Sequence, residues 1–154
     1  MQMAPLVARH VAEVMHGNWT DINLDDTLAD ITYEEAVATP PGIINSIAML
    51  TNHLMFYNQV VIERIKGVDP AINDANGFDV IINTGEQWQQ LKQDTFASFK
   101  ALAEAVTNLT EEKLFSLTPN GHYSFYQTFH GIAEHGHYHL GQIMLIKKII
   151  RATK

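Results

Sequence analysis

The sequence contains no cysteine. This excludes disulfides, thiolate metal ligands and a cysteine nucleophile, so any metal site must use other side chains. Long apolar runs are also missing: no stretch approaches the roughly 18 consecutive apolar residues of a membrane-spanning helix. The first residues lack the charged and then apolar pattern of a secretory signal. We therefore expect a cytoplasmic protein that does not enter a membrane.

Basic residues are scarce as well. Lysine and arginine total 10 against 17 aspartates and glutamates, which gives a formal net charge of −7. Binding to phosphate backbones needs a basic face, so a nucleic-acid partner is disfavoured. An apolar fraction of 46% in 154 residues is enough to form a hydrophobic core without disulfide cross-links. We expect one domain over residues 1–154.

The spacing of apolar residues predicts an all-α fold. Apolar side chains recur every three or four positions in four stretches, which we interpret as helices at about 6–15, 42–66, 85–108 and 122–151. The connections 18–40 and 68–84 are long, and short helical turns are expected at 33–37 and 110–113. The apolar run 78–82 is too short and isolated to build a sheet. Four amphipathic helices with long loop connections predict a four-helix bundle.

Histidine, by contrast, is abundant, with eight in the chain. His135 and His139 are four residues apart and therefore share one face of the last helix. They fill the inward positions between Ile132 and Ile143, where the apolar stripe is interrupted. Imidazoles at core positions need partners for their ring nitrogens, and a shared metal ion supplies one for both. The alternative is a pair of core histidines bonded to carbonyls or hydroxyls.

A metal held by histidines needs a third ligand, for which His53 is the candidate. It lies between Leu50 and Tyr57 on the inward stripe of the helix at 42–66. Gly136 follows His135, so the zinc-peptidase pattern, with a glutamate at that position, is absent. We expect the other histidines outside this site, most of them facing solvent: His10, His16, His122, His130 and His137.

Two segments of the chain resemble a known family. Residues 135–143 closely match the ending HxxxHxGQI, and residues 41–47 followed by His53 are similar to a second-helix segment that carries a metal histidine. Residues 18–20 are in keeping with the same pattern. These segments resemble the DinB/YfiT-like superfamily of metal-binding four-helix bundles. The resemblance implies a long first crossover, often a homodimer, and a divalent ion, commonly zinc or nickel, held by His53, His135 and His139.

The same resemblance implies a range of chemistries. Some members are S-transferases that use bacillithiol, mycothiol or glutathione, one related group isomerises maleylpyruvate with mycothiol, and many have no established activity. Because this chain has no cysteine, any thiolate must come from a small-molecule cosubstrate. No inward carboxylate is evident to act as the base of a hydrolase. We therefore expect a metal-dependent thiol transferase, with a metal-dependent hydrolase or a non-catalytic structural metal site as alternatives.

Several residues are candidates for supporting roles around the ion. A fourth ligand could come from the first long loop, although a solvated acidic face is the simpler interpretation of its carboxylates, Asp21, Asp25 and Asp26. Three side chains near the histidines on the helices are candidates for orienting them: Tyr57, Tyr138 and Gln142. For the two tyrosines, packing or surface positions are the simpler alternative.

Aromatic residues spread over more than one side of two helices and predict a second buried surface. They are Trp88, Phe96, Phe99, Phe125, Tyr126 and Phe129. We expect this surface to pair two copies of the chain in a homodimer. The alternative is that the long loops cover it within one chain, through Trp19, Ile22, Leu24 and Phe78.

Overall fold

The computed structural model describes residues 2–17 and 20–153 of the chain. Within these residues the fold is all-helical, and no strand is formed beyond one isolated bridge between Leu117 and Ser124. The helices are α1 (Met3–His16), α2 (Leu24–Ala29), α3 (Tyr33–Val37), α4 (Ile47–Ile65), α5 (Gly85–Thr107), α6 (Glu111–Phe115) and α7 (Phe125–Ala152). The predicted all-α class is confirmed.

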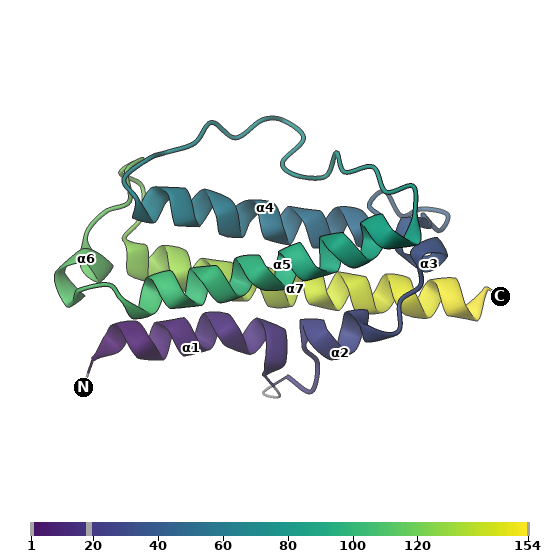
Figure 1. Ribbon diagram of the computed structural model, residues 1–154, viewed down its shortest axis with the longest axis horizontal. Coiled ribbons are helices and arrows are strands. Elements are labelled where there is room, and N and C mark those ends of the chain that lie inside the picture. Colours follow the sequence, from purple (N-terminus) through teal and green to yellow (C-terminus); the bar gives the residue numbers. More distant parts are fainter. Residues whose placement is uncertain (1, 18–19, 154) are drawn as a thin grey trace.

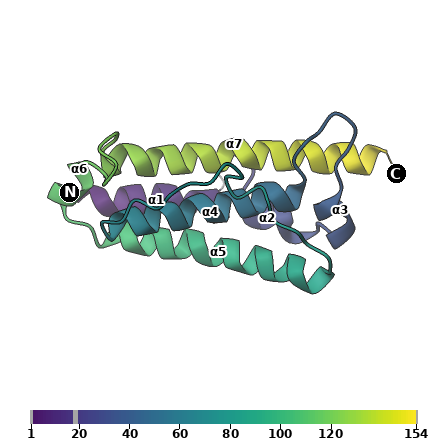
Figure 2. The same ribbon diagram turned by 90° about the horizontal axis from the view of Figure 1, so that it is seen from above.

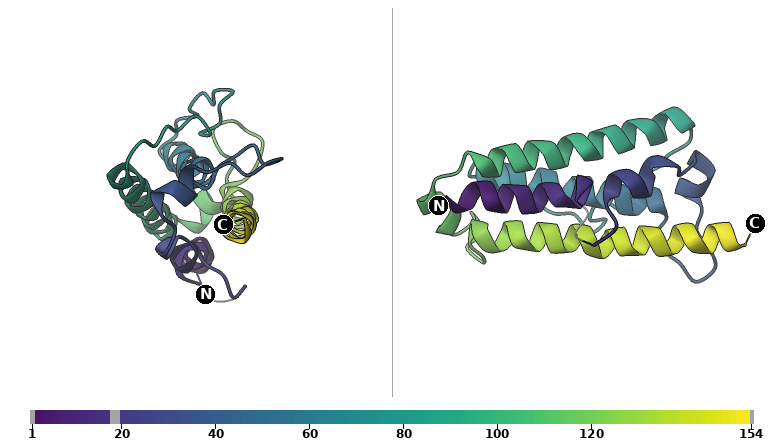
Figure 3. Two further views of the ribbon diagram at one scale, coloured as in Figure 1. Left: turned by 90° about the vertical axis from the view of Figure 1, so that its right-hand side faces the viewer. Right: turned by 90° about the horizontal axis from the view of Figure 1, so that it is seen from below.

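The helices form four rows around one core (Figure 3). The short α2 continues the line of α1, so these two helices together run along much of the longer α7 (Figure 1). Helices α4 and α5 form the other two rows. The α1 helix packs on α5 and α7, and α4 packs on the same two helices. The architecture is therefore the expected helical bundle.

Neighbouring helices α4 and α5 run in the same direction (Figures 1 and 2). Antiparallel neighbours can be joined by a short turn, but parallel neighbours require the chain to return along the whole bundle. Residues 66–84 make this return and pass over α4 as an extended loop. The second long connection predicted from the sequence therefore covers one face of the bundle.

Capping side chains shift the starts of two helices from their expected positions. The Ser46 hydroxyl accepts a hydrogen bond from the Met49 N–H at 3.2 Å, and α4 begins at Ile47 rather than near residue 42. Ser124 caps α7 in the same way, so α7 begins at Phe125 rather than near residue 122. The residues directly before each cap are bends or irregular backbone instead of helix.

The first long connection contains one helix that was expected and one that was not. Helix α3 begins after the capping box of Thr32 and matches the predicted turn. Helix α2 was assigned to a loop because its first turn is acidic. Asn23 caps it by accepting from the Asp26 N–H at 2.8 Å, and Leu24 and Leu28 are fully buried. Acidic residues are favourable in the first turn of a helix, which explains the missed assignment.

Most of the aromatic residues behind the homodimer prediction lie inside the single chain. Trp88, Phe99, Phe125 and Phe129 are fully buried, and Phe96 and Tyr126 are half-buried. The loop residue Leu24 is buried and Ile22 and Phe78 are half-buried, while Trp19 lies outside the described residues. These side chains therefore need no second subunit, and the homodimer stays a prediction. Among the described residues, every helix is too short or too polar to cross a bilayer.

Ion pairs attach α2 and α3 to the C-terminal half of α7. Arg151 Nη1 lies 2.8 Å from Asp30 Oδ2, and its Nη2 lies 2.9 Å from Glu35 Oε2. Lys147 Nζ lies 2.6 Å from Asp30 Oδ1 and donates to the Thr27 carbonyl at 2.9 Å. The side chain of Glu35 is only 6% exposed, so its charge depends on this pairing.

Replacing Arg151 with methionine should destabilise the fold in a pH-dependent way. Arg151 and then Lys147, through hydrogen bonds and charge, hold the pKa of Asp30 below its ordinary value of 3.8. This stabilisation is present above that ordinary value and is lost as the pH falls through the lower pKa of the folded state. Urea unfolding of Arg151→Met should show a lower midpoint at pH 7 and a smaller deficit below about pH 4.

Lys148→Met provides the matched control, because Lys148 lies on the same helix but is exposed. We expect its urea midpoint to stay close to wild type at both pH values. Equal midpoints for the two variants would contradict a stabilising role of the ion pairs.

Candidate metal centre

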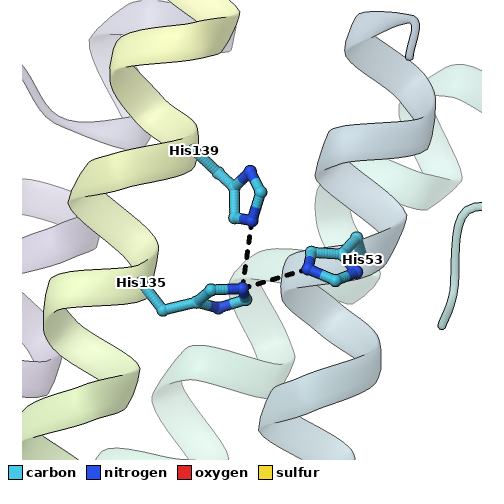
Figure 4. A group of neighbouring side chains, drawn as sticks. All are labelled: His53, His135 and His139. Atoms are coloured by element: carbon cyan, nitrogen blue, oxygen red, sulfur yellow. Dashed lines mark hydrogen bonds between the residues drawn. The ribbon is translucent and has the colours of Figure 1, made fainter. Parts of the chain in front are cut away.

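Three histidine side chains meet between α4 and α7 (Figure 4). His53 Nε2 lies 3.0 Å from His135 Nε2, and His139 Nε2 also lies 3.0 Å from His135 Nε2. One ligand atom from each ring lies within 4.8 Å of the others, so the cluster could hold a metal ion. The structure thus brings together all three residues selected from the sequence.

The geometry of the cluster fits a small divalent ion. Two imidazole nitrogens bound to one tetrahedral zinc ion at ~2.0–2.1 Å lie roughly 3.3 Å apart. The observed separations of 3.0 Å are close to this value. Imidazole nitrogen is a suitable ligand for zinc, nickel, copper and iron, whereas magnesium and calcium prefer oxygen. The donor set therefore favours a transition metal.

Burial keeps these three rings neutral. It lowers the pKa of His53 and of His139 below the ordinary value of histidine. For His135, burial and the neighbouring His139 and His53 lower the pKa to about 4. At neutral pH each ring therefore has one nitrogen without a proton, and the lone pair of that nitrogen is available to a cation.

Two hydrogen bonds select which nitrogen faces the centre of the cluster. His53 Nδ1–H donates to the Asn76 carbonyl at 2.6 Å, and His139 Nδ1–H donates to Gln142 Oε1 at 2.7 Å. With Nδ1 protonated, Nε2 of each ring presents its lone pair to the other histidines. Gln142 thus has the predicted orienting position, whereas the carbonyl of Asn76 was not anticipated.

The loop between α4 and α5 is fastened to α4 at the cluster. Asn76 and Gly77 both adopt positive φ, 55° and 77°. The Tyr57 hydroxyl donates to Asn76 Oδ1 at 2.7 Å, and Asn52 Nδ2 donates to the Gly77 carbonyl at 2.8 Å. These bonds hold the Asn76 carbonyl against His53, and they give Tyr57 an orienting role through the loop.

Phe78 completes this arrangement by stacking on His53. Their ring centroids are 4.0 Å apart with an interplanar angle of 15°. The sequence marked residues 68–84 as a loop rich in turn formers, and its Asn76-Gly77 pair is a common turn signal. Such a signal locates a turn but does not say which helix the turn contacts. The loop was therefore missed as part of the site.

Other candidates lie away from the cluster. Asp21, Asp25 and Asp26 are exposed, and no carboxylate of the described residues joins the three histidines within the same 4.8 Å. The fourth-ligand candidates therefore form the solvated face that was the simpler interpretation. Tyr138 is 63% exposed and contacts His139 only through its ring edge, so it is a surface residue.

The remaining histidines stay outside the site, but not all of them face solvent. His16 and His122 are exposed, as expected. His137 is half-buried, and its Nδ1 bonds the Ala133 carbonyl of its own helix at 2.9 Å. The side chain of His10 is 41% exposed, in keeping with the predicted surface position, although its ring centroid lies 5.4 Å from that of His130. Helix α7 packs beside α1 here, and the phase of α1 alone does not reveal this contact.

Two pockets flank the cluster along the seam between α4 and α7. One, of about 290 Å³, is bordered by Leu50, Gln142 and Ile146. The other, of about 340 Å³, reaches from His135 to Arg64. The second pocket borders His135, whereas the first reaches only Gln142, the hydrogen-bond partner of His139. A small molecule in the second pocket would therefore lie against His135.

Removing any one of the three histidines should sharply reduce metal content. Purified His53→Ala, His135→Ala and His139→Ala variants, exposed to zinc or nickel and then dialysed, should retain much less metal than wild type by mass spectrometry. His137→Ala is the matched control, because among the described residues its ring bonds the Ala133 carbonyl of its own helix and stays outside the cluster. Equal metal content in wild type and in His135→Ala would disprove the assignment.

The loop contact can be tested with two glycines of positive φ. A Cβ at Gly77 would lie 2.7 Å from Phe56 Cβ, whereas a Cβ at Gly67 would meet nothing within 4 Å. Both alanine variants should lose about 1 kcal/mol of stability from the left-handed backbone. Only Gly77→Ala should also displace the loop and weaken metal affinity, by about tenfold. Equal metal affinities in competition titrations would show that the loop does not support His53.

Comparison with known proteins places the chain in a family. The family model described as the DinB superfamily matches residues 19–143, which include the three histidines, Gln142 and the loop over α4. A comparison with curated proteins gives no match. The family match spans most of the 154 residues, and the helical bundle agrees with it. The chain therefore belongs to the DinB superfamily.

Proposed function

We propose that this protein binds a divalent metal ion, zinc or nickel, through His53, His135 and His139, and transfers a group to a low-molecular-weight thiol. The observation that carries the proposal is a cluster of three neutral imidazoles that a pocket reaches at His135, with no carboxylate of the described residues in the cluster. Family membership supports the metal, and the chemistry of the surrounding residues supports the choice of reaction.

The openness of the cluster favours a reactive ion over a structural one. Structural zinc sites usually have four protein ligands, whereas catalytic sites have three and one exchangeable position. In the described part of the chain only the three histidines meet. The pocket that borders His135 would give a small molecule access to the exchangeable position.

The surrounding residues favour a thiol over water as the nucleophile. Hydrolysis by a metal-bound hydroxide would benefit from a nearby carboxylate as general base, and no aspartate or glutamate of the described residues joins the cluster. A bound divalent ion would supply Lewis acidity that lowers the pKa of a thiol. Because the chain has no cysteine, this thiol must be a separate small molecule.

The transfer itself requires no redox partner. The thiol sulfur forms a bond to an electrophilic carbon, the bond from that carbon to its leaving group breaks with its electron pair, and the thiol proton passes to solvent. The protein holds and orients the reactants. Phe78 and Tyr57 line one side of the cluster with aromatic surface, which limits the access of water to the sulfur.

A conjugation assay tests the proposal directly. Protein loaded with zinc or nickel is mixed with monochlorobimane and with glutathione, bacillithiol, mycothiol or mercaptoethanol, and the fluorescent conjugate is followed over time. We expect conjugation above the spontaneous rate with at least one thiol. Chelated protein and the His135→Ala variant should show only the spontaneous rate, while circular dichroism verifies that both remain helical.

Different outcomes would point to the alternatives. Metal-dependent cleavage of esters or amides without added thiol would replace the transferase with a hydrolase. No activity toward any substrate, combined with a large fall in melting temperature on chelation, would indicate a structural ion.

A further inference from the structure

The pocket between α4 and α7 on the Arg64 side of the cluster combines one cationic group with apolar walls. His135 borders it, and Tyr57, Val61 and Ile132 are among its other lining residues. Arg64 is the one lysine or arginine among the described residues that line it. In a chain with net charge −7, this basic side chain lies in the same pocket as one of the three histidines.

Arg64 is held in place with donors to spare. Its side chain is only 15% exposed, and its Nε lies 2.7 Å from Asp69 Oδ1. Among the described residues, the guanidinium makes this one hydrogen bond, which uses one of the five N–H groups of arginine. The Nη groups therefore remain for another acceptor. The planar fork of a guanidinium matches a carboxylate, which it can bind through two parallel hydrogen bonds.

We propose that Arg64 binds a carboxylate of the substrate whose reacting atom lies at the three histidines. This inference rests on the proposed function, since it assigns the chemical class of molecule on which that site acts. The carboxylate belongs either to the thiol or to the electrophile. Arg64 positions the molecule and takes no part in bond making.

The length of the pocket sets the size of this substrate. His135 and Thr128 both border the pocket and are seven residues apart on α7, a rise of about 10 Å. A molecule that lies along the pocket in this direction therefore has room for several bonds between its reacting atom and its carboxylate. A tripeptide thiol has this length, whereas a two-carbon thiol acid does not.

Charge also agrees with a single carboxylate at this position. Arg64 and Asp69 neutralise each other, so the remaining charge of the site is that of a divalent ion. A thiolate and one carboxylate together balance that charge. A phosphate with two negative charges would lie against Asp69 with less compensation.

Equilibrium binding separates this proposal from the proposed function, because it requires no turnover. Metal-loaded protein is titrated calorimetrically with S-methylglutathione, whose sulfur is blocked, and with its diethyl ester, which lacks the carboxylates. Adipate and its dimethyl ester form a second pair without sulfur. Wild type should bind at least one acid more tightly than its ester. Preference for the first acid assigns the carboxylate to the thiol, and preference for adipate assigns it to the electrophile.

Two variants distinguish a ligand contact from a structural ion pair. Arg64→Gln should weaken binding of the preferred acid by about tenfold and leave binding of its ester unchanged. Asp69→Asn breaks the same ion pair but retains the guanidinium, so it should keep or increase the affinity for the acid. Circular dichroism and metal content serve to verify that both variants fold and load.

The proposal is wrong if both variants weaken binding equally, if Arg64→Gln affects acid and ester alike, or if wild type prefers neither acid over its ester. A different outcome is that the protein binds the acid more tightly than the ester through Arg64 but conjugates no thiol. This outcome would support the carboxylate site and contradict the proposed transferase activity. The two hypotheses therefore fail in different measurements.

Discussion

The parallel packing of α4 and α5 determines how the candidate metal centre is built. Because these neighbours run in the same direction, residues 66–84 must travel back along the bundle before α5 begins. That path passes over the middle of α4, where His53 lies. The return loop thereby delivers the carbonyl that fixes the ring of His53 and the aromatic ring that stacks on it. Topology, rather than local sequence, supplies these parts of the site.

The three histidines could be predicted because they lie on helices whose apolar residues recur at a regular spacing. Helical phase shows which positions face inward, and His53, His135 and His139 interrupt apolar stripes at such positions. Gln142 follows from the same geometry, since it lies one turn beyond His139. Helical phase can therefore predict contacts between side chains on one helix, and between inward side chains of two neighbouring helices.

The loop contacts could not be predicted in this way. Asn76 meets His53 across 23 positions of sequence, and an extended loop has no period that reveals which side faces the protein. The same limit applies to the contact between the rings of His10 and His130, which depends on how α7 packs beside α1. Helix α2 was missed for a different reason: a six-residue helix is too short to establish a period, and its acidic first turn resembles a polar loop.

The two acceptors that orient the histidines differ in kind. Gln142 acts through its side chain, so one codon change can remove the acceptor of His139. His53 instead bonds a main-chain carbonyl, which every amino acid at position 76 would provide. The orientation of His53 therefore depends on the path of the loop, which the Asn76 side chain helps to hold by accepting from Tyr57 and by tolerating a positive φ. Natural variation should adjust His139 by direct substitution of its acceptor, and His53 through changes in the loop and its turn.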